Sequence, residues 1–242
     1  MRWRSAVGIV LAVLLAALVA LGEESPRRHV VDFAAFTALL DAGEPLLLID
    51  TRTEDSYHDG HIPTAIGIPG YLFNRDGAIP ALPDDRNTIL IAYCGGGHCG
   101  VADFVGERLL DRGYRRVFVF EEGVEGWRAH GQLLVTKRHE ELPSISKQDL
   151  AALVAAGSPM SLLDARAPAE FQGRTVPGAV NLPVENCRPG TEHMPPSVDM
   201  LVVVYGQSRW DGRPYHVADR LLAWGYKKVR LFSGGVNEWS KP

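Results

Sequence analysis

The stretch LLLIDTRTEDSYHDGHIPTAIGIP, residues 46–69, decides the fold because the chain contains it twice. The second copy is SLLDARAPAEFQGRTVPGAVNLP, residues 161–183, and it aligns with the first at one constant spacing without a gap. The identical residues are Asp50, Arg52, Pro63, Ala65 and Pro69, which return as Asp164, Arg166, Pro177, Ala179 and Pro183. A second block pairs Tyr93, Gly113, Tyr114, Phe120, Gly123, Val124 and Trp127 with Tyr205, Gly225, Tyr226, Phe232, Gly235, Val236 and Trp239. The repeat predicts two copies of one domain.

Each copy alternates short apolar runs with helical patterns, which is typical of a parallel sheet with helices on both faces. We expect strands over residues 46–49, 88–93 and 117–120 in the first copy. Asp32 is a predicted helix N-cap there, and Ser146 with Asp149 resembles a capping box in the second copy. The predicted fold class is therefore α/β, with tandem domains over residues 29–140 and 141–242 that meet near Glu140.

The amino terminus has the three-part layout of a secretory signal. Arg2 and Arg4 precede the uncharged apolar run 6–21, and Ala20 and Gly22 are small residues at cleavage-site spacing. A retained membrane anchor is the alternative if this signal is not cleaved, but the run is shorter than the roughly 20 residues of a spanning helix. We expect a signal peptide over residues 1–22 and an exported protein, periplasmic or secreted, with no membrane contact after cleavage.

Composition excludes a nucleic-acid partner. The chain has 242 residues, 46% of them hydrophobic and 22% charged, and a formal net charge of −4. Its lysines and arginines are scattered and give no basic field for a phosphate backbone. These values describe an ordinary globular chain.

The glycine-rich segment AYCGGGHCGV, residues 92–101, is the candidate reaction centre. A turn between a strand and a helix presents backbone N–H groups and the positive end of the helix dipole. Glycines at 95, 96, 97 and 100 let those donors converge as an anion-binding loop around Cys94. Such a position favours the thiolate, which is the nucleophilic form of cysteine. His98 could add charge or exchange a proton.

Several segments in register resemble the rhodanese (sulfurtransferase) family. They are IDTRTEDSYHDGHIPTA, AYCGGGHCG, DRGYRRVFVFEEG and the following EGW, and the similarity spans both copies. The resemblance implies that Cys94 takes a sulfane sulfur from a thiosulfate-like or persulfide donor, holds it as a persulfide and passes it to a thiophilic acceptor. Asp50, Arg52, His61 and Trp127 are then framework residues. The implied partners are a small sulfur-containing anion, or a thiol or persulfide carrier, with a periplasmic protein partner as a further option and no cofactor.

Two departures from the family pattern affect these expectations. Many members carry an arginine at the position of Cys99, so no fixed guanidinium binds the donor here, and this also argues against the phosphatases of related fold. The second copy has Gly206 in place of Cys94 and Asp211 in place of Cys99. It is expected to be a structural partner that closes the pocket of the first copy or a binding module, although Arg209 and Arg213 could still hold an anion.

The sequence leaves the role of the cysteine pair open. Cys99 is a candidate resolving thiol that displaces sulfur from a persulfide on Cys94, and a purely structural disulfide is the alternative. A short ring would gain little from closure, which favours the reactive interpretation. Zinc held by Cys94, His98 and Cys99 is disfavoured because no fourth ligand stands out. A non-catalytic binding or sensor module, or a thiol–disulfide redox protein, remains the alternative function. Cys187 is expected to be a packing residue.

Overall fold

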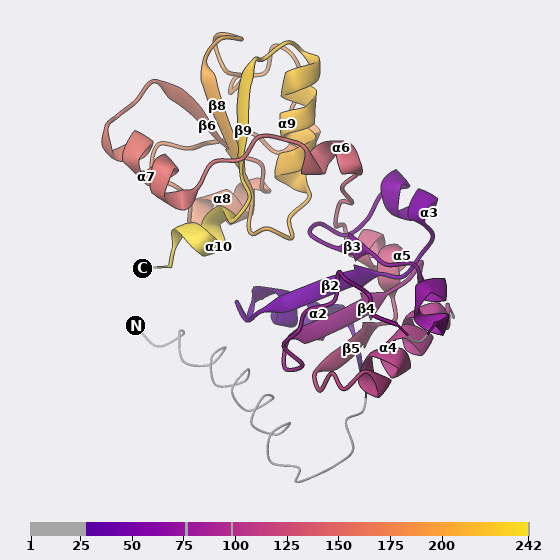
Figure 1. Cartoon of the computed structure of the whole chain (residues 1–242). Helices are drawn as coiled ribbons and strands as arrows, with labels where there is room; N and C mark the ends of the chain where they lie inside the picture. The colour runs from indigo at the N-terminus through magenta and orange to yellow at the C-terminus, as the bar shows by residue number, and fades with distance from the viewer. Residues whose placement is uncertain (1–27, 76, 98, 242) are drawn as a thin grey trace.

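The computed structural model describes residues 28–75, 77–97 and 99–241. The predicted signal peptide, residues 1–22, and His98 therefore lie outside the described residues. Figure 1 shows two α/β units, which we call domain 1 and domain 2, with the short helix α6, Lys137–Glu140, between them. Two parallel sheets covered by helices confirm the predicted fold class. The domain limits 29–140 and 141–242 stay predictions.

Domain 1 is built on a parallel sheet with strand order β1-β5-β4-β2-β3. The strands are β1 His29–Val31, β2 Leu46–Asp50, β3 Ile66–Gly67, β4 Ile89–Tyr93 and β5 Val117–Phe120. The three longest of them are the strands expected from the apolar runs. β2 continues to Asp50 because its ladder with β4 extends to the Asp50–Tyr93 pair.

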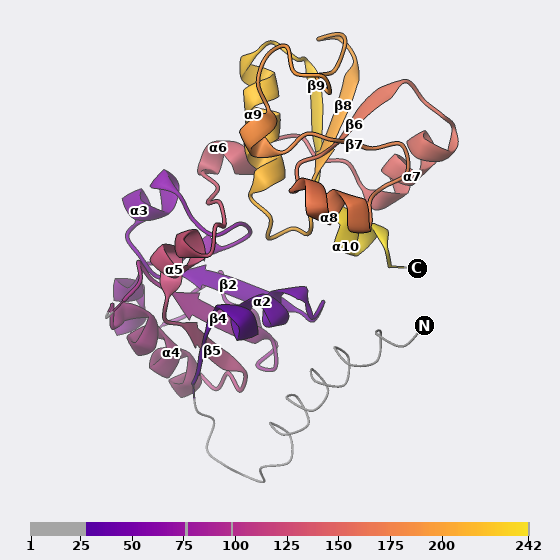
Figure 2. The same cartoon turned by 180° about the vertical axis from the view of Figure 1, so that it is seen from behind.

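Helices cover both faces of this sheet. They are α2 Phe33–Asp41, α3 Glu54–Asp59, the 3-10 turn η1 Gly70–Asn74, α4 Val101–Asp111 and α5 Gly123–Ala129. Phe36 and Trp127 bring α2 and α5 into one buried cluster, and Val105 and Phe73 bring α4 and η1 into a second cluster on the other face. Figure 2 shows α2 in front of the strands. All five residues of β4 are buried, as expected of a central strand covered on both sides.

Domain 2 repeats this plan with a parallel sheet of order β7-β6-β8-β9. Its elements are α7 Lys147–Ala155, β6 Met160–Asp164, α8 Pro168–Gly173, β7 Val180–Asn181, η2 Val184–Asn186, β8 Leu201–Tyr205, α9 Arg213–Ala223, β9 Lys228–Phe232 and α10 Gly235–Trp239. A single parallel bridge between Ser144 and Leu231 takes the place that β1 has in domain 1. Leu150 of α7 and Val217 of α9 belong to separate buried clusters. Helices therefore flank both faces here too.

The predicted helix caps are present. The Asp32 carboxylate accepts a hydrogen bond from the backbone N–H of Ala35 (2.8 Å), and the Ser146 hydroxyl oxygen accepts one from Asp149 N–H (3.1 Å). The pair is not a full capping box. In a capping box the Asp149 carboxylate would accept from the backbone N–H of Ser146, but here it accepts from the Ser146 hydroxyl (2.7 Å). Each cap satisfies an N–H group that the helix start leaves free.

Domain 2 contacts domain 1 through the loop that follows β8 and through α10. The Trp210 indole N–H donates to the carbonyl oxygen of Leu40 at the end of α2 (2.8 Å), and Asn237 donates to the Asp41 carboxylate (3.2 Å). Among the described residues, none of the hydrogen bonds between the domains involves residues 94–97, 99 or 100. The expectation that domain 2 closes the pocket of domain 1 stays a prediction.

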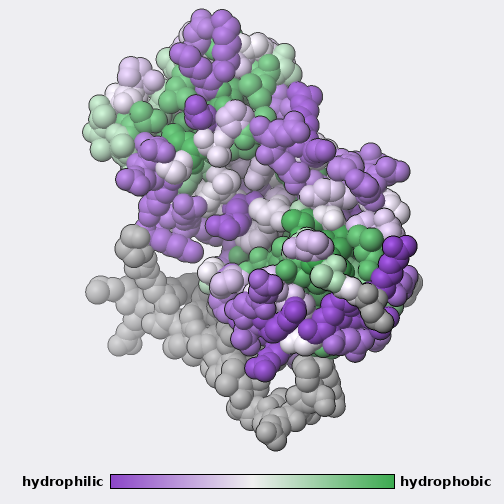
Figure 3. All heavy atoms as spheres, viewed as in Figure 1, coloured by the Kyte–Doolittle hydropathy of each residue, from purple (hydrophilic) through white to green (hydrophobic). Residues whose placement is uncertain are grey.

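The surface of both domains is mainly hydrophilic in the view of Figure 3, with an area of hydrophobic residues on each. Within the part of the chain that the structure describes, every helix is too short or too polar to span a bilayer.

Candidate functional site

Cys94 lies directly after β4, the central strand of domain 1, and only 8% of its surface is exposed. Its carbonyl oxygen accepts a hydrogen bond from Val124 N–H (3.0 Å), and the next carbonyl, of Gly95, accepts from Glu125 N–H (2.8 Å). These bonds fasten the Cys94 loop, which we define as residues 94–100, to the first turn of α5. The sulfur is therefore held at the end of a rigid strand.

Cys94 and Cys99 form a disulfide in the structure, with their Cα atoms 6.3 Å apart. Cys99 immediately precedes Gly100, the N-cap of α4, and its side chain packs against the same buried cluster that contains Cys94. The bond closes the glycine turn into a short ring. In this state neither thiolate is free as a nucleophile or as a zinc ligand.

Two of the four predicted loop glycines are required by the backbone. Gly96 and Gly97 have positive φ angles of 139° and 29°. A Cβ at Gly96 would lie 2.7 Å from Glu125 Cβ and 2.9 Å from the Glu122 carbonyl oxygen, whereas one at Gly95 or Gly100 would meet nothing within 4 Å. The described part of the loop thus depends on Gly96 and Gly97 for its path. His98, between them and Cys99, lies outside the described residues.

Gly123 is a site residue that the sequence analysis did not single out. It has a φ of 56°, and a Cβ there would lie 2.3 Å from the Cys94 carbonyl oxygen. Only glycine lets α5 start so close to the backbone of Cys94. The signal was present in the repeat, since Gly235 occupies the matching position with a φ of 58°.

A buried ion pair supports the strand end that carries Cys94. Arg52 donates to Asp50 (Nη2 to Oδ2, 2.6 Å) and to the carbonyl oxygen of Gly60 (2.6 Å). Burial lowers the pKa of Arg52, but its bonds to Asp50 outweigh burial and raise it, so the guanidinium stays charged. Thr51 between them donates its hydroxyl to the Tyr93 carbonyl oxygen (2.8 Å). This turn therefore holds Tyr93, the residue that precedes Cys94.

His61 and Trp127 are buried framework residues. The His61 ring is stacked on Tyr57 with centroids 3.9 Å apart, and its Nε2 lies 3.1 Å from the Glu140 carboxylate of α6. The Trp127 indole N–H donates to the Leu133 carbonyl oxygen (3.1 Å). These contacts fix the position of the segment that leaves domain 1, and neither ring is hydrogen-bonded to the described part of the Cys94 loop.

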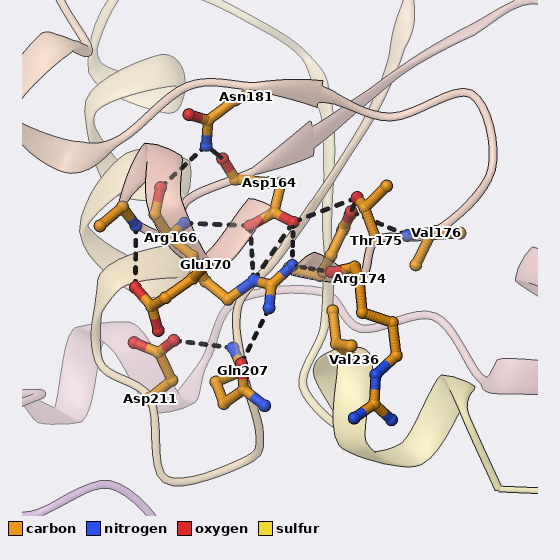
Figure 4. A network of polar contacts seen from close by, with 12 residues as sticks. Asp164, Arg166, Glu170, Arg174, Thr175, Val176, Asn181, Gln207, Asp211 and Val236 are labelled. Carbon is orange, nitrogen blue, oxygen red and sulfur yellow. Dashed lines mark hydrogen bonds and ion pairs between the residues drawn. The ribbon is translucent and has the colours of Figure 1, made fainter. Parts of the chain in front are cut away.

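The matching loop of domain 2 is filled by its own carboxylate (Figure 4). Asp211 Oδ2 accepts a hydrogen bond from Gln207 N–H (2.8 Å), and Oδ1 accepts from Arg213 N–H (3.0 Å). A Cβ at Gly206 would lie only 2.4 Å from Asp211 Oδ2. The carboxylate therefore occupies the space next to Gly206 where a cysteine side chain would project.

The arginines of the domain 2 loop are not equivalent. Arg213 is engaged inside the protein, because it also donates to the Glu170 carboxylate (Nη1 to Oε2, 2.5 Å). Burial raises the pKa of Glu170, but the bonds from Arg213 outweigh this and lower it. Arg209 is exposed and lines clefts between the domains together with Trp210. Arg213 is therefore already neutralised by its own domain and does not offer a free charge to an external anion.

Cys187 is separate from the site. It is a free thiol in the core of domain 2 with 1% of its surface exposed. Burial raises the pKa of this thiol, and the nearby Arg220 opposes the shift only in part. A buried thiol of raised pKa is a poor nucleophile, so the structure places Cys187 among the packing residues.

Comparison with known proteins identifies both units. The rhodanese-like domain matches residues 32–130 and again residues 146–242. A sulfurtransferase from Allochromatium vinosum is 27% identical over 105 residues, which cover 43% of this chain and 92% of that protein. An HTH-type transcriptional regulator from Mycobacterium tuberculosis is 37% identical over 92 residues, and the chain spans only 38% of its length.

Solved structures with similarity include sulfur-transferring enzymes. The thiosulfate sulfurtransferase of Pseudomonas aeruginosa is 25% identical, with a TM-score of 0.39, and the match covers 88% of this chain and 42% of that one. A 3-mercaptopyruvate sulfotransferase of Escherichia coli is 20% identical, with a TM-score of 0.36, and covers 89% of this chain and all of its own. Since the two family matches together take up most of the sequence, this chain belongs to the rhodanese family and carries two rhodanese-like domains in tandem.

Proposed function

We propose that this protein is a sulfurtransferase in which Cys94 of domain 1 carries the transferred sulfur as a persulfide. One observation carries the proposal. Cys94 is placed at the carboxyl end of the central strand, in a glycine loop that enters helix α4, and domain 2 has neither the cysteine nor the space for it. A nucleophile at such a strand end faces the backbone N–H groups of the loop and the positive end of the helix.

The chemistry begins once the Cys94–Cys99 disulfide has been reduced. The Cys94 thiolate attacks the outer sulfur of thiosulfate, the sulfur–sulfur bond breaks, and sulfite leaves with the electron pair. The outer sulfur stays on the protein as a persulfide, which a thiophilic acceptor such as cyanide then attacks, releasing thiocyanate and restoring the thiolate. A low-molecular-weight persulfide donates in the same way and releases a thiolate.

The charges around the loop favour a persulfide over thiosulfate as donor. Cys99 stands where many relatives have arginine, and a Cβ at Gly96 would lie 2.8 Å from Glu125 Oε2. A carboxylate so near the loop repels thiosulfate, which concentrates two negative charges in one small anion, more than the single charge of a reacting persulfide group. We expect the reduced protein to react faster with glutathione persulfide than with thiosulfate at equal concentration, and Glu125→Gln to narrow this difference.

Intact mass spectrometry tests the function. The mature protein is reduced, freed of reductant and exposed to each donor, with Cys94→Ser and Cys99→Ser in parallel. The proposal expects Cys99→Ser to gain one sulfur and Cys94→Ser to gain none, whereas the wild-type protein either keeps the sulfur or releases it as sulfide. If the fully reduced protein and its Cys99→Ser variant gain no sulfur from either donor, Cys94 is not a sulfur carrier.

We also propose that the protein acts outside the cytoplasm. The signal-like residues 1–22 support this, and so does the Cys94–Cys99 disulfide, because such bonds persist in oxidising compartments. A partner in that compartment would be a thiol or persulfide carrier. Fractionation of the native host, with amino-terminal sequencing of the mature chain, tests export. Recovery of full-length protein from the cytoplasm alone would contradict it.

The disulfide itself favours a second candidate function, a non-catalytic module or a thiol–disulfide redox protein. Domain 2, whose loop is filled by Asp211, is already a module of the non-catalytic kind. This alternative expects that a mild monothiol leaves the disulfide intact, or that reduction brings disulfide exchange with protein substrates but no sulfur gain. Measurement of the intact mass before and after reduction, each time with exposure to donor, distinguishes this alternative from the sulfurtransferase.

A further inference from the structure

We infer that Cys99 is a catalytic residue that resolves the Cys94 persulfide, so that the protein releases sulfide instead of storing sulfur for an external acceptor. The inference rests on the proposed function and adds to it the fate of the sulfur. It begins from the disulfide, which shows that the Sγ atoms of Cys94 and Cys99 meet within the folded loop. The attacking thiol is thus built into the same ring as the carrier.

The geometry selects which sulfur Cys99 attacks. Its Sγ is bonded to Cys94 Sγ, the inner sulfur of the persulfide, and the Cα atoms are 6.3 Å apart. Cys94 is held in place by the bonds from Val124 N–H and Glu125 N–H to its loop, and Thr51 N–H and hydroxyl hold Tyr93. Because Cys94 Sγ is held in place and the Cys99 thiol reaches it, attack on this inner sulfur is favoured over transfer of the outer sulfur to Cys99.

The reaction balances without a metal or cofactor. The Cys99 thiolate attacks Cys94 Sγ, a Cys94–Cys99 disulfide forms, and the outer sulfur leaves with the electron pair of the broken bond as hydrosulfide. The sulfane sulfur is reduced by two electrons and the two cysteines are oxidised by two. An external dithiol then reduces the disulfide and closes the cycle, so the net reaction is the reduction of a sulfane sulfur to sulfide by a dithiol.

Proximity makes this step faster than capture by a dilute acceptor. Groups held in reactive geometry behave as if at effective concentrations on the order of 10⁵ M or more. The start of α4, one residue after Gly100, also places positive dipole charge beside Cys99, which stabilises its thiolate. A structural role explains the pair less well, because closing so short a ring adds little to stability.

A single-turnover experiment separates the two steps. Reduced protein is freed of reductant, mixed with glutathione persulfide in equal amount, and assayed for released sulfide and for intact mass. We expect the wild-type protein to release one sulfide per chain and to end as the Cys94–Cys99 disulfide. Cys99→Ser should keep the added sulfur on Cys94 and release sulfide at least about tenfold more slowly. Cys187→Ser, a matched loss of a thiol outside the site, should behave as wild type.

The outcomes are distinguishable. If wild type and Cys99→Ser hold the persulfide equally long, the inference is overturned while the sulfurtransferase proposal stands. If Cys99→Ser gains no sulfur and the wild-type protein releases no sulfide, the proposed function fails and the inference with it. Cys99→Ala serves as a second variant, and circular dichroism establishes that each variant is folded before it is assayed. Transfer of the sulfur to Cys99, seen as a persulfide on that residue by peptide mapping, would also overturn the inference.

Discussion

Gly96 is the loop residue on which the path of the Cys94 loop depends most directly. We expect Gly96→Ala to destabilise domain 1 by roughly 1–3 kcal/mol. The alanine would have to adopt the positive φ of this position, and its Cβ would lie too close to Glu125 and Glu122. The rate of sulfur gain by the reduced protein should fall as well. Thermal unfolding measures the first effect, and intact mass after exposure to donor, with both proteins in the Cys99→Ser background, measures the second.

Gly100→Ala is the matched control for that prediction. Gly100 has a helical backbone with φ −61°, and a Cβ there would meet no atom within 4 Å. We expect its stability to change by less than about 0.5 kcal/mol and its sulfur gain to stay at the wild-type level. Equal effects of the two substitutions would mean that the positive φ and the close contacts of Gly96 do not determine the path of the loop.

Cys187 provides a prediction about a thiol that does not react. In the folded reduced protein we expect iodoacetamide to modify Cys94 and Cys99 well before Cys187, because burial raises the pKa of Cys187 and blocks access to it. Cys187→Ala should cost on the order of 1 kcal/mol in stability and leave sulfur gain unchanged. Peptide mapping of the label over time checks this. Early labelling of Cys187 in folded protein would contradict it.

Sequence reasoning located the candidate nucleophile because a cysteine after an apolar run and before glycines predicts one local structure. It could not decide whether Cys94 and Cys99 are paired, since pairing depends on the distance between two sulfurs across a flexible turn. It also treated four glycines alike. Only their φ angles and neighbouring atoms, which the sequence does not contain, separate Gly96 and Gly97 from Gly95 and Gly100.

The loop after β8 is the element in which domain 2 has Gly206 and Asp211 in place of the cysteine pair. We expect Gly206→Ala to destabilise domain 2 by roughly 1–3 kcal/mol, because its Cβ would collide with the Asp211 carboxylate. The penalty should be smaller in an Asp211→Ala background, since the colliding group is then absent. Denaturant unfolding of the four proteins of this double-mutant cycle measures the coupling energy, expected at roughly 0.5–3 kcal/mol. Additive effects would show that Asp211 does not fill the space beside Gly206.

Strands and helices were predictable where the apolar pattern was long. The expected strands at 46–49, 88–93 and 117–120 correspond to β2, β4 and β5, whose burial produces the pattern. The edge strands β1 and β3 were not predicted, because they have three and two residues and half of each faces away from the core. Tertiary pairing with β5 and β2 makes them strands, and such pairing leaves no periodic signal.

For the molecule as a whole, the repeat predicted tandem domains, but it could not predict how they touch. The contacts use Trp210, Leu40 and Asn237, none of which recurs between the copies. A repeat records what two domains share, whereas their mutual interface depends on where they differ. The hydrogen bonds between the domains lie at α2 and at the segment that precedes α6.

A buried histidine at this interface gives the last prediction. His139 of α6 is 7% exposed, and its Nδ1 accepts a hydrogen bond from Thr136 N–H (3.0 Å), which requires that nitrogen to be unprotonated. The His216 ring of α9 lies 4.8 Å away between centroids. Burial lowers the pKa of His139, and His216, Arg138 and His61 lower it further, while Asp219 acts in the opposite direction.

The sign of the pH effect follows from that shift. With a folded pKa below the ordinary 6.5, the unfolded chain binds more protons than the folded chain once the pH falls below about 6.5, so the free energy of unfolding decreases there. Above that pH the contribution of His139 is constant. We expect the unfolding temperature to be lower at about pH 5.5 than at about pH 7.5, and His139→Asn, which keeps an acceptor near the Nδ1 position, to reduce this drop. His193→Asn, at an exposed position in domain 2, should keep the full drop. If the unfolding temperature of His139→Asn falls as much on acidification as that of the wild-type protein, protonation of His139 does not cause the loss of stability.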